Sequence, residues 1–475
     1  VVTTNTYFYN VSGSIKRANE AGADDLNSQV NSYRGTNQGD YSTDLEHIKS
    51  ITYNSLVMMQ GTTVIGDRLK GEELADYTEN YGSGGRLVTT SVYFYEEANL
   101  RAEQASEDAL TRRINTYRRE EENIGLIQSA EYTTNLKSAT INHINGRLKG
   151  EEVADYTQSY NSQGQVSGLS VYLYDVEGVV LAQRAYTTQS DDLNVQVRSY
   201  RRDVDQALVD AEYTSGLKSI TYNDTAGRQK GEELADYTEN YNSRAEKSST
   251  SIYFYDTEKV RAKDAALEAL THQVNTYRKQ LEDQAGVLTA DYTNRIKSIT
   301  VNSIEITDGT TTTARLKGEE VADYTETYNS SGQKTDTSVY FYDEIKARAN
   351  YADEEALTHQ INTYRKQVDA GEVSDAVYGI AEGMVKSVTV NNIIMNIGTP
   401  EEADRLKGEE VADYTENYNT SGEKTSTTVY FYDSAKVRAQ YAGEEALTHQ
   451  VNTYREELLD PASVIGSDFT TYLKS

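Results

Sequence analysis

The histidines are the first residues to weigh for chemistry, because an imidazole can act as a general base or bind a metal near neutral pH. Three of them occur in a repeated Thr-His-Gln string and two stand elsewhere: His272, His359 and His449, then His47 and His143. A related stretch carries Arg112 where the string has its histidine. A role that requires imidazole would therefore not be common to all copies, and we expect solvated or hydrogen-bonded positions.

An acidic cluster follows a glycine near the carboxyl end of the chain. Glu409, Glu410 and Asp413 lie just after Gly408, and Lys407 precedes it. Calcium prefers oxygen-rich sites of this kind, but the spacing matches no EF-hand loop. We expect a structural role, with an exposed ion pair between Lys407 and one of the glutamates. Calcium is the alternative, and no other metal or cofactor is expected.

Two other residue types could carry chemistry. Lys386 and Asn391 are the types that form intramolecular isopeptide bonds, although both are also common surface residues. Tyrosine pairs such as Tyr430 and Tyr432 suit cross-strand packing, and exposed pairs of this kind can bind carbohydrate. No nucleophile with a partnered base, phosphate-binding loop or metal-ligand spacing is present, so we expect no enzyme.

Composition excludes several classes of partner. The chain has 475 residues, a net charge of -29, 39 Tyr and no Cys. Nucleic acid is an unlikely partner for so acidic a chain, because binding depends on cations that neutralise phosphates. No apolar run is long enough to span a membrane as a helix. The absence of disulfides is compatible with an extracellular location but does not require it.

The clearest pattern is an internal repeat. The string RLKGEE recurs with small changes, and its glycines lie 79 to 90 residues apart. They are Gly71, Gly150, Gly231, Gly318 and Gly408. Of the 29 residues from 315 to 343, 24 recur at 405 to 433. Self-similarity at a fixed period indicates a stacked repeat architecture.

Each unit opens with a strand of the form KSITxN, as at 218–223, because its apolar residues alternate with polar ones. A connector of variable length follows, and one copy contains the hairpin signal Asp308-Gly309. A hairpin comes next. In the last unit it runs from Val411 to Tyr418, turns at 419–422 and returns from Thr425 to Tyr432.

After the hairpin the apolar spacing becomes i, i+4, i+7 and i+11, which predicts a helix with a narrow apolar seam. The three sets are Leu447, Val451, Tyr454, Leu458; Leu357, Ile361, Tyr364, Val368; and Leu270, Val274, Tyr277, Leu281. A shorter helical segment is expected at 290–296. The fold class is thus an α+β tandem repeat, a three-stranded antiparallel sheet plus one long helix and a helical turn per unit, in a linear array.

The expected domains follow the repeat. They are a partial repeat at 1–47 and repeats at 48–135, 136–216, 217–295, 296–384 and 385–475. The first residues match a return strand and the last match an opening strand. We expect either a window cut from a longer array or half-strands completed by the next chain through strand complementation.

The segment Asp413 to Asp433, with its glycine turn, Thr-rich return strand and closing Tyr-Phe-Tyr-Asp, resembles the hairpin repeats of the YD/RHS class of large secreted bacterial proteins. The resemblance covers about 20 residues per unit. The class has a shorter period with no intervening charged helix. The resemblance implies a secreted, surface-exposed, modular architecture and does not extend to a toxin shell.

These observations favour a structural subunit or segment of an extracellular filament, tube or surface layer. The alternative is a surface adhesin or carbohydrate-binding repeat stalk. The expected partner is the chain itself, as a homopolymer or as consecutive repeats. Polar residues repeated almost unchanged suggest contacts between units, and the candidates are Lys407, Gly408, Glu409, Tyr414, Tyr418, Tyr430 and Tyr432.

Overall fold

The computed structural model is antiparallel β structure almost throughout. It describes residues 3–34, 47–82, 85–118, 124–161, 163–201, 204–279, 281, 283–397, 403–443, 446–456, 458 and 460–474. The chain divides into two compact units, Val1–Lys247 and Ser248–Ser475, and each is described by itself. Within the described residues, the helical segments are 3-10 turns of three residues each.

Each full repeat contains four long strands, which we call A, B, C and D in chain order. The A strands are β4 Ile48–Ser55, β11 Leu136–His143, β16 Leu217–Asp224, β20 Ile296–Ser303 and β26 Val385–Asn392. The B strands are β7 Leu74–Tyr81, β12 Val153–Tyr160, β17 Leu234–Tyr241, β23 Val321–Tyr328 and β29 Val411–Tyr418. All of them are eight residues long.

The C and D strands also occur in the part of the chain before the first A strand. The C strands are β1 Thr3–Val11, β8 Leu87–Tyr95, β13 Val166–Tyr174, β18 Lys247–Tyr255, β24 Lys334–Tyr342 and β30 Lys424–Tyr432. The D strands are β3 Leu26–Arg34, β10 Thr111–Arg118, β15 Asn194–Arg201, β19 Thr271–Arg278, β25 Thr358–Arg365 and β31 Thr448–Arg455.

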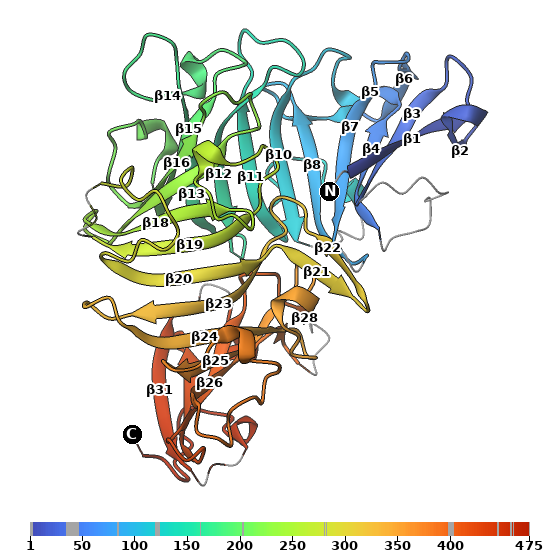
Figure 1. Cartoon of the computed structure of the whole chain (residues 1–475). Coiled ribbons are helices and arrows are strands. Elements are labelled where there is room, and N and C mark those ends of the chain that lie inside the picture. The colour runs from blue at the N-terminus through green and yellow to red at the C-terminus, as the bar shows by residue number, and fades with distance from the viewer. Residues whose placement is uncertain are drawn as a thin grey trace. The chain divides into compact units, whose positions relative to one another are not determined.

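These long strands pair in chain order within each unit (Figure 1). In the first unit the antiparallel pairs join β1, β3, β4, β7, β8, β10, β11, β12, β13, β15, β16 and β17 in turn. In the second they join β18, β19, β20, β23, β24, β25, β26, β29, β30 and β31. Each repeat therefore continues the sheet of the one before it.

The prediction of a long helix is wrong, because the residues assigned to that helix form the D strands. The predicted α+β class is therefore wrong as well. In β19, Gln273, Asn275 and Tyr277 are buried, while Val274 faces the other way. Leu270 precedes this strand and Leu281 follows it. The apolar residues matched a helical spacing by coincidence, since the buried face of the strand is made of Gln, Asn and Tyr.

The buried polar row satisfies itself by hydrogen bonds. Gln273 donates to Asn275 Oδ1 at 2.7 Å, and Asn275 donates to Tyr277 Oη at 3.1 Å and to the Ala290 carbonyl at 2.6 Å. Tyr277 donates to the Tyr292 carbonyl at 2.8 Å. The prediction of a helical segment at 290–296 is wrong: residues 290–295 form turns that supply these carbonyl groups, and Ile296 begins β20. A buried polar side chain is tolerated when it is paired in this way.

The connector between the A and B strands carries a small hairpin in three repeats. These hairpins are β5 Val57–Gln60 with β6 Thr63–Asp67, β21 Glu305–Asp308 with β22 Thr311–Ala314, and β27 Ile394–Met395 with β28 Ala403–Asp404. The turn expected at Asp308-Gly309 is confirmed, with Gly309 at φ 57°. Part of the last connector lies outside the described residues.

The hairpin between the B and C strands is confirmed in the last repeat, where β29 pairs with β30 and Gly422 has φ 79°. Asn419 Oδ1 closes this turn by accepting from the amides of Ser421 and Glu423. The third repeat keeps the same turn although Ala245 replaces the glycine, so Ala245 adopts φ 58°. This left-handed conformation costs about 1–2 kcal/mol for a residue with a Cβ.

Loops cover both faces of the sheet. On one face Val92 and Phe94 of β8 pack with Tyr117 and Leu136 beneath Ile127 of the loop after β10. On the other face the neighbouring Tyr95 packs with Leu74 and a row of alanines from the segment between the C and D strands: Ala102, Ala105 and Ala109. Equivalent clusters in the second unit surround Phe341 and Tyr342.

The remaining short elements lie in these covering loops. Strands β2 Ser14–Arg17, β9 Leu100–Arg101 and β14 Gln183–Arg184 pair with the ends of C strands. The 3-10 turns are η1 Ala18–Glu20, η2 Ala102–Gln104, η3 Ile124–Leu126, η4 Ala185–Thr187, η5 Gln206–Leu208, η6 Ala262–Asp264, η7 Ala349–Tyr351, η8 Ala370–Glu372, η9 Ala439–Tyr441 and η10 Pro461–Ser463.

We expect Asn275→Ala to destabilise its repeat by about 1–3 kcal/mol, because the substitution removes three buried hydrogen bonds, with Gln273, Tyr277 and the Ala290 carbonyl, and leaves that carbonyl only the longer bond from Gln273 at 3.2 Å. Val274→Thr, on the opposite face of the same strand, should cost less. Urea unfolding and hydrogen exchange over 271–278 in the full chain measure both. On a helix with the predicted seam the order would be reversed, and that result would contradict the strand assignment.

Candidate functional site at the repeat seam

The RLKGEE turn joins each A strand to its B strand, and it begins with a buried arginine. In the last repeat Arg405 is 0% exposed, and its Nη2 donates to the carbonyls of Ala439 and Ala442 at 2.7 and 2.8 Å. Its Nη1 donates to the Glu409 carbonyl at 3.1 Å. The arginine thus fixes the turn to the segment between the C and D strands of its own repeat.

The same turn also reaches back to the preceding repeat. Lys407 Nζ donates to the Glu354 carbonyl at 2.6 Å. Glu410 Oε1 accepts from the Thr358 amide at 2.8 Å, and its Oε2 accepts from the Gly408 amide at 2.8 Å. We use the word seam for the contacts that join two neighbouring repeats. On one side lie the RLKGEE turn and the A strand of a repeat, and on the other side lies the D strand of the preceding repeat.

The A strand completes the seam. Asn391, at its end, donates to the Thr358 carbonyl at 2.9 Å. Both backbone polar groups of Thr358 are therefore bonded by side chains of the following repeat. These side chains are needed because the sheet is irregular here: Tyr342 pairs with Thr358 and Phe341 with Gln360, so His359 is the extra residue of a bulge.

Four other repeats make the same two contacts to the first or second residue of a D strand. The glutamate accepts from the amides of Asn27, Thr111, Asn194 and Thr271 at 2.8–3.0 Å, through Glu73, Glu152, Glu233 and Glu320. The asparagine donates to their carbonyls at 2.9 Å, from Asn54, Asn142, Asn223 and Asn302. The seam thus recurs in both units with the same residue types.

The lysine of the turn varies more in its acceptor. Lys70, Lys149 and Lys317 donate to backbone carbonyls of the preceding repeat, at Ala23, Glu107 and Leu267. Lys230 instead donates to the Glu152 carbonyl in the preceding turn. Such exposed contacts contribute less than the buried ones, because water competes for both partners.

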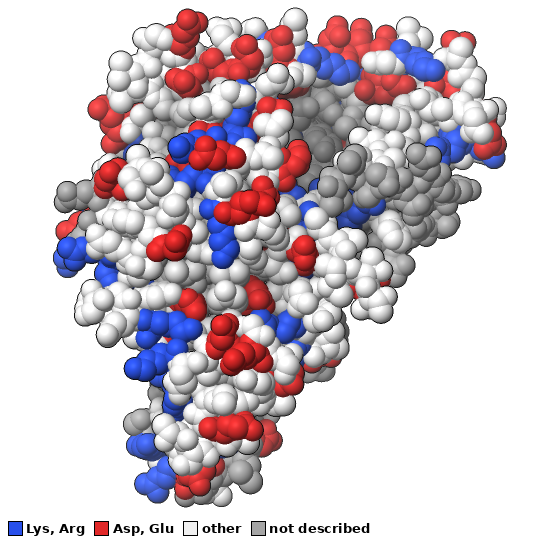
Figure 2. Space-filling view, in the orientation of Figure 1, with Lys and Arg blue, Asp and Glu red and all other residues white. Residues whose placement is uncertain are grey.

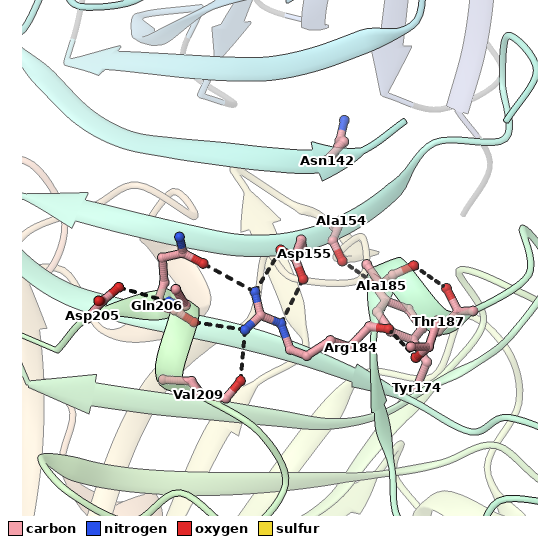
Figure 3. A network of polar contacts seen from close by, with 12 residues as sticks. Asn142, Ala154, Asp155, Tyr174, Arg184, Ala185, Thr187, Asp205, Gln206 and Val209 are labelled. Atoms are coloured by element: carbon pink, nitrogen blue, oxygen red, sulfur yellow. Dashed lines mark hydrogen bonds and ion pairs between the residues drawn. The ribbon is translucent and has the colours of Figure 1, made fainter. Parts of the chain in front are cut away.

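A second arginine ties the B strand to the loops that cover the sheet (Figure 3). Arg184 forms a bidentate pair with Asp155 of β12 at 2.7 Å for both bonds, and its Nη1 donates to the carbonyls of Gln206 and Val209. The pairs Arg101–Asp76, Arg348–Asp323 and Arg438–Asp413 repeat this arrangement. Paired guanidinium and carboxylate groups tolerate burial that either would resist alone.

A third arginine ends the D strand and spans two further strands. Arg365 Nη1 donates to the Val385 carbonyl of the next A strand at 2.6 Å, and its Nη2 donates to the Tyr418 carbonyl of the next B strand at 3.1 Å. Arg34, Arg118 and Arg201 make the equivalent pairs of contacts. These arginines also connect one repeat to the next.

The structure separates the acidic residues considered as calcium ligands. Glu410 lies in the seam, Asp413 pairs with Arg438, and Glu409 Oε2 accepts from the Leu406 amide at 3.2 Å. Within the described residues there is no group of three or more His, Cys, Asp or Glu side chains that could hold a metal.

The four candidate tyrosines of the last repeat make different contacts. Tyr418 Oη donates to Glu416 at 2.8 Å, and Tyr430 Oη bonds with the Thr415 hydroxyl at 3.1 Å. Tyr432 donates to the Ala412 carbonyl at 2.5 Å, and burial raises its pKa to about 12. Tyr414 packs beside Val429 and Phe431, and burial raises its pKa to about 12 also.

The histidines lie on strands or in loops. His272 and His359 are bulge residues whose Nδ1 atoms bond with the carbonyls of Asp256 and Asp343 at 2.8 and 2.9 Å. His449 is exposed, as is His47. His143 lies at the end of β11 and faces Arg147. Burial lowers the pKa of His143, and the positive charge of Arg147 lowers it further.

Lys386 and Asn391, considered for an isopeptide bond, point to different partners. Lys386 Nζ pairs with Asp336 at 2.9 Å, whereas Asn391 belongs to the seam. Sequence reasoning missed the three sets of arginines and the buried Gln-Asn-Tyr row. Their signal was present, because Gln-x-Asn-x-Tyr-Arg recurs unchanged at 273–278, 360–365 and 450–455 with a period of two.

Comparison with known proteins gives no family for this chain. No protein-family description matches the sequence, and no curated protein matches it. Among the described residues, no helix is both long and apolar enough to cross a membrane.

Solved structures that match this chain, all with low TM-scores, include complexes of TcdB2-TccC3 and a Tc holotoxin pore. A TcdB2-TccC3-Cdc42 structure matches with a TM-score of 0.16 and 9% identity, over 96% of this chain and 22% of the other. The Photorhabdus luminescens Tc holotoxin pore matches with a TM-score of 0.09 and 10% identity, over 93% of this chain and 27% of the other. This chain thus spans about a quarter of the length of the proteins it matches.

We expect Glu410→Gln to weaken its seam by about 1–2 kcal/mol, because the amide loses the negative charge and one of the two acceptor oxygens. Hydrogen exchange should rise at the start of β25 and in the turn at 406–410. Glu372→Gln, at an exposed position, is the matched control. Equal exchange in the two variants would show that the glutamate adds nothing to the seam.

The pKa of His143 predicts a pH dependence. The unfolded imidazole binds a proton near pH 6.5, whereas the folded one resists it, so stability falls as the pH drops below about 6.5. His143→Asn, the residue type that Asn392 supplies in the last repeat, should remove this part of the loss between about pH 6.5 and 5. Thermal unfolding across that range measures it, with exposed His449→Asn as control. Parallel curves for all three proteins would refute the prediction.

Proposed function

We propose that this chain is a structural segment of a secreted or cell-surface protein, in which tandem repeats extend an antiparallel sheet along the chain. The observation that supports it best is the seam. The same Glu and Asn side chains bond the same backbone groups of the preceding repeat in both units. Residues maintained at such contacts have a role in joining repeats rather than in binding a small ligand.

The recurrence of polar residues is thereby accounted for inside the chain. A packed core requires only that the apolar pattern persist, so conserved polar identity needs a separate cause. The seam, the Arg–Asp pairs and the arginines of the D strands supply one, since each side chain has a defined backbone or carboxylate partner. The proposal assigns no enzymatic activity and no cofactor to the segment.

More specifically, we propose that the segment belongs to an extracellular filament, tube or surface layer. The seam contacts are the same in both units. Further repeats could therefore be added to the array through the same interface. Figure 2 shows acidic and basic side chains interspersed over one face of the molecule. A net charge of -29 keeps such an extended surface soluble through self-repulsion.

Negative-stain electron microscopy of the full chain, with the intact mass measured in parallel, tests whether the segment assembles into a filament, tube or layer. We expect regular fibres or layers with an axial period commensurate with the repeat. Dispersed particles of 53.1 kDa at all protein concentrations would contradict it. Binding of those particles to a carbohydrate array would instead favour the adhesive alternative.

A further inference from the structure

Two repeats contain a pair of stacked tyrosines that bridges the A and B strands. Tyr53 of β4 lies directly opposite Tyr77 of β7, and their ring centroids are 4.5 Å apart at an interplanar angle of 22°. Tyr222 and Tyr237 take the same positions in β16 and β17, at 4.5 Å and 19°. The A-strand position of the pair, occupied by Tyr53 and Tyr222, is tyrosine in these two repeats and not in the other three.

The other repeats place an aliphatic residue opposite the same B-strand tyrosine. The pairs are Ile141 with Tyr156, Val301 with Tyr324 and Val390 with Tyr414. The sheet therefore forms with either partner, so packing alone does not require the second tyrosine. These repeats also show which substitution the strand accepts without loss of fold.

The stacked rings are held in place, yet remain accessible. Tyr77 packs against the core around Val92 and Phe94, and Tyr53 packs against the cluster of Tyr33 and Ile51. All four stacked tyrosines are partly exposed to solvent, and electrons can pass from them to an oxidant at the surface. Two phenols immobilised face to face form a site where a second radical is always within reach of the first.

A carboxylate lies ready to receive a phenolic proton. Glu79 Oε2 accepts hydrogen bonds from Tyr53 Oη at 3.2 Å and Tyr81 Oη at 2.7 Å. In the third repeat Glu239 accepts from Tyr241 Oη at 2.8 Å and pairs with Lys247. Burial raises the pKa of Tyr77 to about 12 and that of Tyr53 further, so the phenols stay protonated and each must lose its proton together with its electron.

We propose that Tyr53 with Tyr77, and Tyr222 with Tyr237, are sites of oxidative cross-linking to dityrosine by a peroxide-driven one-electron oxidant. Each phenol loses one electron to the oxidant and one proton: Glu79 accepts the proton of Tyr53, and solvent accepts the protons of Tyr77, Tyr222 and Tyr237. The two radicals join through a bond between ring carbons ortho to the hydroxyls, and the two protons bound to those carbons then leave as the phenols re-form. The balance is two tyrosines and one hydrogen peroxide to one dityrosine and two waters.

The cross-link would do for this chain what a disulfide does elsewhere, because the sequence has no Cys. It would join the A strand covalently to the B strand and close the connector that carries the seam turn. Such closure stabilises a fold chiefly by restricting the unfolded chain. The inference does not depend on the proposed structural function, since it concerns pairs within single repeats.

The test treats the dilute full chain with a haem peroxidase and hydrogen peroxide, then maps cross-linked peptides by mass spectrometry. We expect peptides joining 53 with 77 and 222 with 237, each lighter by two hydrogens than the sum of its parts, at least about tenfold above any other tyrosine pair. Oxidation should also raise the melting temperature while the chain remains monomeric.

Tyr53→Val is the matched control, because Val301 and Val390 occupy that position in other repeats. It should abolish the first cross-link and leave the second, and Tyr222→Val should do the reverse. Cross-links confined to exposed residues such as Tyr186 and Tyr351, or persisting at Tyr77 in the Tyr53→Val variant, would overturn the proposal. So would a chain without dityrosine in a reaction that converts added free tyrosine.

Discussion

The sheet is irregular at the start of each D strand, and the backbone amide and carbonyl there need hydrogen-bond partners. The recurring polar residues of the repeat depend on this requirement. Each D strand starts beside a bulge, where its first residues are displaced from the regular ladder of the next A strand. An amide or carbonyl withdrawn from water without a partner costs about 1–3 kcal/mol, so side-chain hydrogen bonds to these partly buried groups stabilise the strand. A glutamate and an asparagine of the following repeat do this, as Glu410 and Asn391 do at Thr358. Continuity of the sheet and identity of the polar residues thus have one cause.

The arginines extend the same logic to the loops. A sheet whose two faces carry Phe94 and Tyr95 side by side needs cover on both faces, and the loops that follow the C and D strands provide it. Such loops have carbonyl groups turned inward. Arg405 and Arg438 bond several of these carbonyls at once, because a guanidinium presents five donors in a fixed fork. The loops are thereby held to the sheet by polar contacts as much as by packing.

The sequence predicted the repeat, the A strand and the B–C hairpin, because in these the apolar residues alternate and a glycine or asparagine marks the turn. It misled at the D strand. The spacing of Leu270, Val274 and Tyr277 suggested a helix, whereas within the strand Gln273 and Asn275 are buried and Val274 faces the other way. Patterns of hydrophobicity assume that polar residues face water, and this strand violates that assumption through internal hydrogen bonds. The roles of Glu410 and Asp413 were equally hidden, since their partners lie 52 and 25 residues away in the sequence.

The central claim is that the seam glutamates couple neighbouring repeats. The most direct test is urea unfolding of the full chain against a variant in which Glu73, Glu152, Glu233, Glu320 and Glu410 are all replaced by glutamine. Repeat arrays unfold together only while the interfaces between neighbours are strong. The account predicts that the wild type unfolds in few, steep transitions and that the variant unfolds in several shallow ones at lower urea. Transitions of unchanged steepness and midpoint in the variant would contradict it.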